Sequence, residues 1–124
     1  MVCIVRVMNS EKDEVMVVLA TFPDEERARQ IGTILVKNQV AACVNLLPAV
    51  RSIFQWEGKV EDEMEALAVI KTTRGAYARM ESMLREAHPY EEPEVIALPV
   101  VAGSDGYLSW VAASVGAGPE SQDV

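Results

Sequence analysis

The sequence is poor in the residue types on which most catalytic and metal-binding motifs depend. Its 124 residues include one histidine, two cysteines, two tryptophans, three tyrosines and two phenylalanines. One histidine excludes an HExxH zinc motif, and the cysteines, Cys3 and Cys43, are too far apart in the chain for a CxxC pair. No glycine-rich phosphate loop or nucleophile elbow is present. We therefore expect a protein that is not an enzyme.

Positive charge and long hydrophobic runs are also scarce. The sequence has eleven Lys and Arg and nineteen Asp and Glu, which gives a net charge of −8. Binding a phosphate backbone needs clustered positive side chains. The apolar run Val15–Ala20 falls far short of the ~20 residues that span a bilayer. We expect no nucleic-acid partner and no membrane span. Two cysteines without an export signal indicate free thiols in a reducing compartment, so a cytoplasmic location is expected.

The apolar residues near the start of the chain follow a strand pattern and then a helix pattern. The β-branched run Val15–Thr21 predicts a buried strand. Asp24 can cap a helix that begins with an acidic turn and ends near Lys37, with one apolar stripe facing the core.

Two unusually long extended runs follow this helix. They cover Val40–Trp56 and Lys59–Arg74, and Glu57-Gly58 between them predicts a tight hairpin turn. Each run is roughly three times the usual strand length of ~5–6 residues. Pro48 marks a bend or bulge in the first run, because proline cannot donate to a central ladder.

The last third of the chain predicts a helix over Gly75–Ala87, a strand over Glu94–Val101 and a short helix from Asp105. The whole order is that of a ferredoxin-like α+β fold, βαββαβ plus a C-terminal helix, with helices on one face of an antiparallel sheet. We expect an N-terminal extension at 1–14, one domain at 15–115 and a disordered tail at 116–124.

The expected sheet is apolar on both faces, and helices on one side cover only one of them. The residues concerned are Ala42, Val44, Leu46, Leu67, Val69, Ile96 and Leu98 with their neighbours. A monomer would expose a large apolar surface and long strand edges, which favours association. We infer a closed oligomer in which the long hairpin pairs with a neighbouring chain.

The single histidine lies in the stiff segment His88-Pro89-Tyr90-Glu91-Glu92-Pro93. Each proline biases the residue before it toward an extended conformation, so an imidazole, a phenol and two carboxylates stand close together. Two interpretations stay open. His88 either caps the preceding helix or, with nearby carboxylates, serves as a metal ligand.

Five segments together resemble a known family. They are Ala41-Ala42-Cys43-Val44-Asn45, Trp56-Glu57-Gly58-Lys59, Lys71-Thr72-Thr73, His88-Pro89-Tyr90-Glu91 and Tyr107-Leu108-Ser109-Trp110. In order and spacing they resemble the divalent-cation tolerance proteins called CutA, over residues 15 to 115. The resemblance implies an intertwined homotrimer similar to that of the PII signalling proteins. It also implies a role in tolerance to divalent metal ions, copper above all, with direct Cu(II) binding by some members.

The resemblance implies a metal site that this chain matches only in part. The matching residues are His88, Glu94 and Cys43, with Glu91 as a further candidate ligand, whereas Ala20 stands where the family has a cysteine ligand. Without that thiolate the donor set suits Cu(II) or Zn(II) rather than Cu(I), and no metal should be needed for folding. Cys43 can equally be a small buried hydrophobe.

The alternative function is a PII-like signalling or scaffold trimer. Its ligand cleft would hold a small anionic ligand with Tyr90, Lys71 and Arg74, or meet a protein partner. We favour a plainer role for the two cations, as ion pairs with Glu61, Asp62 and Glu63. For the large aromatic residues we expect contacts at the subunit interface, made by Trp56, Tyr107 and Trp110.

Overall fold

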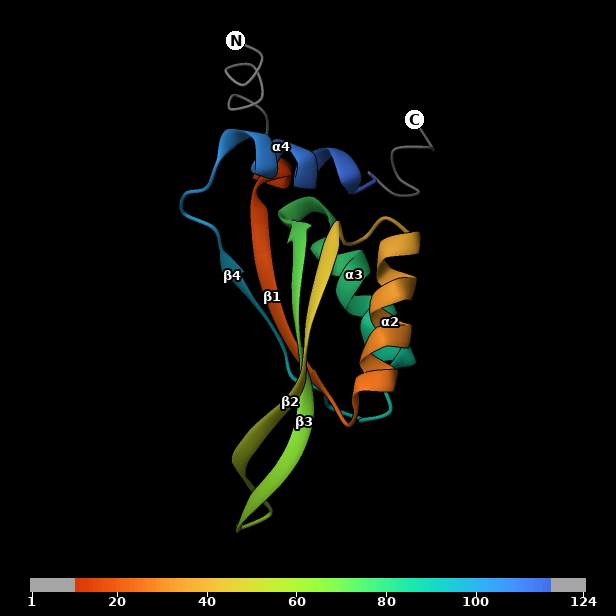
Figure 1. Cartoon of the computed structure of the whole chain (residues 1–124), viewed down its shortest axis with the longest axis vertical. Helices are drawn as coiled ribbons and strands as arrows, with labels where there is room; N and C mark the ends of the chain where they lie inside the picture. The colour runs from red at the N-terminus through yellow and green to blue at the C-terminus, as the bar shows by residue number, and fades with distance from the viewer. Residues whose placement is uncertain (1–10, 117–124) are drawn as a thin grey trace.

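The computed structural model describes residues 11–116 of the chain. The elements run in the order η1 (Glu11–Asp13), β1 (Val15–Phe22), α2 (Glu25–Lys37), β2 (Cys43–Trp56), β3 (Lys59–Thr73), α3 (Arg74–Ala87), β4 (Val95–Pro99) and α4 (Asp105–Ser114). Figure 1 shows helices α2 and α3 side by side on one face of the sheet, with α4 across one end. No helix among these residues is long and apolar enough to cross a membrane.

The four strands form one antiparallel sheet in the order β2-β3-β1-β4. β1 is central, so that Val18 pairs with Ile70 of β3 on one side and with Ala97 of β4 on the other. Consecutive strands β2 and β3 form the hairpin, while helices connect the remaining strands. The predicted ferredoxin-like α+β fold is confirmed.

Both large helices begin at a capping side chain. Asp24 precedes α2 with an extended backbone, and its Oδ1 accepts a hydrogen bond of 2.7 Å from the backbone N–H of Arg27. Thr73 caps α3 in the same way, since its Oγ1 accepts from the N–H of Ala76 at 3.3 Å. Such caps satisfy amide groups that the helix itself leaves unpaired.

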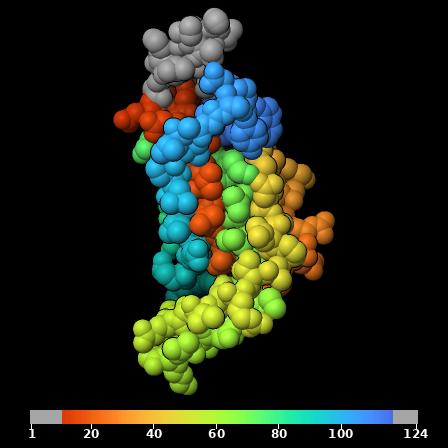
Figure 2. All heavy atoms as spheres, turned by 60° about the vertical axis from the view of Figure 1, so that its left-hand side comes forward, coloured from red at the N-terminus to blue at the C-terminus, as the bar shows by residue number. Residues whose placement is uncertain are grey.

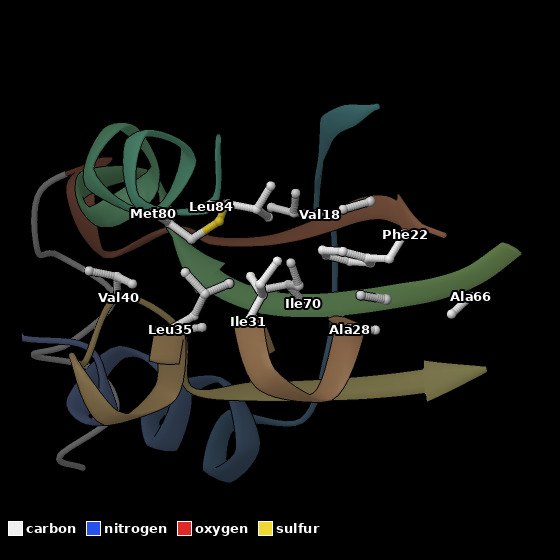
Figure 3. Close-up of a cluster of buried hydrophobic side chains, with 13 residues drawn as sticks. Val18, Phe22, Ala28, Ile31, Leu35, Val40, Ala66, Ile70, Met80 and Leu84 are labelled. Carbon is white, nitrogen blue, oxygen red and sulfur yellow. The ribbon is translucent and has the colours of Figure 1, made fainter. Parts of the chain in front are cut away.

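The hydrophobic core fills the space between these helices and one face of the sheet (Figure 3). Even-numbered residues of β1 and β3 point into it, and the helices contribute residues three to four positions apart. The larger side chains are Val18, Phe22, Ile31, Leu35, Ile70, Met80 and Leu84.

The opposite face of the sheet has no helix over its middle, as Figure 2 shows for the row of strands β4, β1, β3 and β2. Ile96 on this face is 51% exposed and Leu98 is 48% exposed. Leu47 on the edge strand is 44% exposed. The prediction that helices cover only one of two apolar faces is therefore confirmed.

The β2–β3 hairpin continues beyond the body as an arm, defined here as residues 50–65 (Figure 1). The β1 ladder ends where Phe22 pairs with Ala66, so the arm is a two-stranded ribbon within the protomer. The predicted irregularity at Pro48 is present as a register shift between Leu47 and Val50. At the tip, Glu57 (φ 51°) and Gly58 (φ 80°) adopt the left-handed conformation that tight hairpins require.

Three expected boundaries differ from those observed. The first long strand starts at Cys43 rather than at Val40, because the Val40 carbonyl instead accepts a hydrogen bond from Thr72 Oγ1 at 2.7 Å. The β3 strand stops at Thr73, the N-cap of α3. The last strand is shorter than predicted and ends at Pro99, which has no N–H to extend the ladder.

The ends of the chain are described only in part. Within the proposed extension 1–14, the Glu14 carbonyl accepts from the Arg74 N–H at 2.8 Å, so residues 11–14 pack against the start of α3. Gly116 is joined to the Gln39 carbonyl through its N–H at 2.9 Å. Residues 1–10, with Cys3, and most of the expected tail, 117–124, lie outside the described residues.

Truncating the core side of α2 should cost much more stability than truncating its outer side. Leu35→Ala should lower the free energy of unfolding by about 2–5 kcal/mol, because Leu35 is fully buried among core residues. The adjacent Ile34→Ala, at a position 39% exposed, should cost less than about 1 kcal/mol. Urea denaturation at one fixed protein concentration measures both; equal losses would contradict the described core.

Candidate functional site

His88 is a buried capping residue at the end of α3. Only 7% of it is exposed, and its N–H donates to the Arg85 carbonyl at 3.3 Å. Its ring Nε2 lies 2.8 Å from the Thr21 carbonyl oxygen, which can only accept, so Nε2 carries the proton. Nδ1 then accepts a 3.0 Å hydrogen bond from the backbone N–H of Tyr90. Both ring nitrogens are thus occupied within the chain.

The imidazole also sits between two aromatic rings. It stacks on Phe22 with ring centroids 4.9 Å apart and 25° between the planes, and Tyr90 lies 4.8 Å away on a tilted plane. Burial lowers the pKa of His88 below its ordinary 6.5, and the nearby Arg27 charge lowers it further. The Thr21 hydrogen bond and the Glu65 charge act in the opposite direction without reversing the shift. A neutral imidazole fits this environment.

Tyr90 connects this turn to the arm. Its hydroxyl donates to Glu65 Oε2 at 3.1 Å, and Glu65 is only 8% exposed although it is an acidic residue. Burial, the hydrogen bond to Glu65 and nearby carboxylates raise the pKa of Tyr90 to about 12. The phenol therefore keeps its proton at physiological pH and holds the Glu65 carboxylate at the root of the arm.

The other predicted metal ligands do not gather around His88. Glu91 and Glu94 are exposed, and Glu92 pairs with Arg85 at 3.2 Å. Among residues 11–116, no three His, Cys, Asp or Glu side chains are placed to hold a metal ion together. The donors that we predicted therefore do not fit a metal within one protomer.

Cys43 lies toward the other end of the sheet. It is opposite Lys71, which pairs with Val17 of β1, whereas His88 bonds to Thr21 of the same strand. Four residues of strand separate these positions by about 13 Å. Cys43 is a free, half-buried thiol whose Sγ lies 3.8 Å from Asn45 Oδ1. Tyr107 of α4 reaches the same place, and burial together with Cys43 raises its pKa.

The predicted ion pairs of Lys71 and Arg74 with the acidic run of β3 are wrong. Lys71 hydrogen-bonds to Asn45, a diagonal neighbour on the adjacent strand β2, and Arg74 pairs with Glu14 at 3.0 Å. Of the expected partners Glu61, Asp62 and Glu63, Asp62 pairs with Arg51 at 2.8 Å. Strand register places both cations about 20 Å or more from Glu65 and hence from Tyr90. One protomer therefore does not assemble the proposed ligand cleft.

The predicted interface aromatics are exposed in the protomer. Trp56, at the tip of the arm, is 57% exposed. Tyr107 and Trp110 share one face of α4 with ring centroids 5.6 Å apart, and both are partly exposed. Glu65, Thr21 and Phe22 were not predicted as site residues. The signal for Glu65 was weak, because a carboxylate in an acidic run ordinarily indicates a solvated surface.

The fold and these motifs agree with a comparison against protein families. Residues 16–114 match the model described as CutA1 divalent ion tolerance protein. The chain belongs to this family. A "Divalent-cation tolerance protein CutA" from Thermus thermophilus is 42% identical over 100 residues, which is 81% of this chain and 97% of that protein. The solved structure of the T. thermophilus protein Cut A1 matches this chain with a TM-score of 0.81 at 41% identity. The match covers 82% of this chain and 99% of that chain.

CutA relatives differ in length. "Protein CutA, chloroplastic" from Arabidopsis thaliana is 40% identical over 96 residues, 77% of this chain but only 53% of that longer protein. Its name places that relative in a chloroplast, so membership of the CutA family does not fix one compartment, and the cytoplasmic location stays a prediction.

The lowered pKa of His88 predicts a specific acid sensitivity. In the folded CutA chain its pKa lies below the unfolded value near 6.5, so the unfolded state binds more protons between the two values. The contribution of the neutral His88 side chain to the free energy of unfolding is fully present above pH 6.5. It is lost as the pH falls from there through the pKa of His88 in the folded state. The stability difference between wild type and His88→Gln should therefore shrink between pH 7.5 and pH 5. Urea denaturation at both pH values measures it; a difference independent of pH would contradict a buried neutral imidazole.

Proposed function

We propose that this CutA chain acts without catalysis as a homotrimer in divalent-cation tolerance, and that it binds Cu(II) or Zn(II) with donors from adjacent subunits. The observation that carries the proposal is the uncovered apolar face of the sheet. Beside it lies an arm whose two strands pair only with each other within the protomer. The family membership and the names of the relatives support the cation role.

The apolar face supports the oligomer. Ile96 and Leu98 on β4, Leu47 on β2 and Ile53 on the arm are all at least 44% exposed in the protomer. Exposed apolar side chains on one face of a sheet, with another on the adjoining arm, favour an interface. The edge strands β2 and β4 still have unpaired backbone groups on their outer sides, which a neighbouring arm can satisfy.

The positions of the donors support a site shared between subunits. Glu91 and Glu94 have accessible carboxylates, and Cys43 has a free thiol, but a stable site needs three or four ligands. Ala20 is fully buried and faces the helices, so a thiolate at that position would point into the core rather than toward these donors. His88 joins the set only if it gives up its bonds to Thr21 or Tyr90.

A charge on the uncovered face should break the trimer. Ile96→Glu places a carboxylate on the apolar face, where burial between subunits would leave it unpaired. Sedimentation velocity should show a trimer for wild type and a smaller species for this variant. The matched control, Ile34→Glu on the outer side of α2, should remain a trimer. A monomeric wild type, or a trimeric Ile96→Glu variant, would contradict the proposed interface.

Metal binding should depend on the accessible donors. Isothermal titration with Cu(II) should show binding in wild type and at least tenfold weaker binding in Glu94→Gln, because loss of one of a few ligands costs on the order of 1.4 kcal/mol or more. Glu86→Gln, a change at an exposed carboxylate on α3, serves as the control. Equal affinity in wild type and Glu94→Gln would exclude this carboxylate.

The single histidine gives a direct check on the ligand set. His88 is the one imidazole in the sequence, so its ring-nitrogen signals in a nuclear magnetic resonance titration with diamagnetic Zn(II) need no assignment. We expect them to stay unshifted when binding saturates. A stoichiometric shift would add His88 to the ligands. The signalling alternative would be favoured if nucleotides raised the melting temperature and metals did not.

A further inference from the structure

The arm leaves the body with few restraints. Beyond Ala66 its two strands pair only with each other within the protomer, and an isolated two-stranded ribbon is marginally stable in water. The register shift beside Pro48 interrupts the ladder at the same level. From Glu65 to Lys59 the arm spans about 20 Å, so a tilt of roughly 10° at its root would move the tip by roughly 3–4 Å.

One side-chain hydrogen bond of residues 11–116 joins the arm to another element. It runs from the Tyr90 hydroxyl to the Glu65 carboxylate at 3.1 Å. Glu65 is the last residue of the arm before the three-stranded part of the sheet and is 8% exposed. The ion pair of the arm, Arg51 with Asp62, lies within the ribbon and cannot fix its direction.

Tyr90 is itself held by His88. The Tyr90 N–H donates to Nδ1 at 3.0 Å, while Nε2 donates to the Thr21 carbonyl at 2.8 Å near the end of β1. Stacking on Phe22 fixes the plane of the imidazole. The chain of contacts therefore runs without a gap from the end of β1, through the proline-bounded turn, to the root of the arm.

We propose that the contacts Thr21–His88–Tyr90–Glu65 form a link that sets the direction of the arm. His88 and Tyr90 act in this link as positioning residues. The His88 imidazole serves because it donates on one side and accepts on the other, which lysine and arginine cannot do. This part of the inference rests on the proposed trimer. Where the arm meets a neighbouring subunit, the direction of the arm decides whether its strands align with the strands of that subunit.

Amide hydrogen exchange tests the link in the full chain. Tyr90→Phe removes only the hydroxyl and keeps the ring beside His88, so the amides of residues 50–65 should exchange about tenfold faster than in wild type. Tyr77→Phe is the matched control, because the Tyr77 hydroxyl bonds to Glu81 on α3, away from the arm. Exchange in the arm should not change in the control. Unchanged exchange in Tyr90→Phe would overturn the proposal.

Changes at Glu65 separate a link from two independent contacts. Glu65→Ala should speed exchange in the arm as much as Tyr90→Phe, and the double variant should add nothing, because both remove one bond. Glu65→Gln keeps an acceptor oxygen and should retain most of the protection. Additive effects, or a loss in Glu65→Gln equal to that in Glu65→Ala, would overturn the link. Sedimentation velocity reports the trimer and the exchange comparisons report the link, so failure of the trimer and failure of the link are distinguishable.

Discussion

The rest of the structure depends on an imbalance between one layer of helices and two apolar faces of a sheet. Helices α2 and α3 bury the even-numbered side chains of β1 and β3, among them Val18 and Ile70, and leave Ile96 and Leu98 on the opposite face exposed. Burying apolar surface is the main favourable term in folding and association. The exposed face and the projecting arm are therefore the surface from which we infer association with other chains.

The proline-bounded turn shows how a histidine beside carboxylates in the sequence can be occupied by contacts within the protomer. His88 has a lone pair at Nδ1, but the Tyr90 N–H occupies it, and Thr21 takes the proton on Nε2. Displacing either contact would leave a buried polar group unpaired, at a cost of about 1–3 kcal/mol. These contacts give the His88 imidazole a structural role that needs no metal.

Local patterns in the sequence predicted the helices, the strands and the hairpin turn. Contacts between distant segments depended on how the chain pairs in three dimensions, which local patterns do not show. Asp24 predicted the start of α2, and Glu57-Gly58 predicted the hairpin turn, because caps and tight turns are set by neighbouring residues. The partners of Lys71 and Arg74 were mispredicted, because cross-strand neighbours depend on pairing between distant segments. Glu65 was not predicted as a site residue for a related reason. Only the tertiary position of Tyr90 distinguishes it from the exposed carboxylates Asp62 and Glu63 that precede it.

The same geometry constrains how the proposed cation site and the proposed trimer would be related in this chain. The candidate donors Glu91, Glu94 and Cys43 are separate in one protomer, so a multidentate site would require residues of more than one chain. A ligand that binds only between subunits stabilises the assembled state by mass action. Cation binding and association would then reinforce each other by the same factor. Because the Tyr90–Glu65 bond lies at the root of the arm, it would act on both through the arm's direction, without contacting a metal.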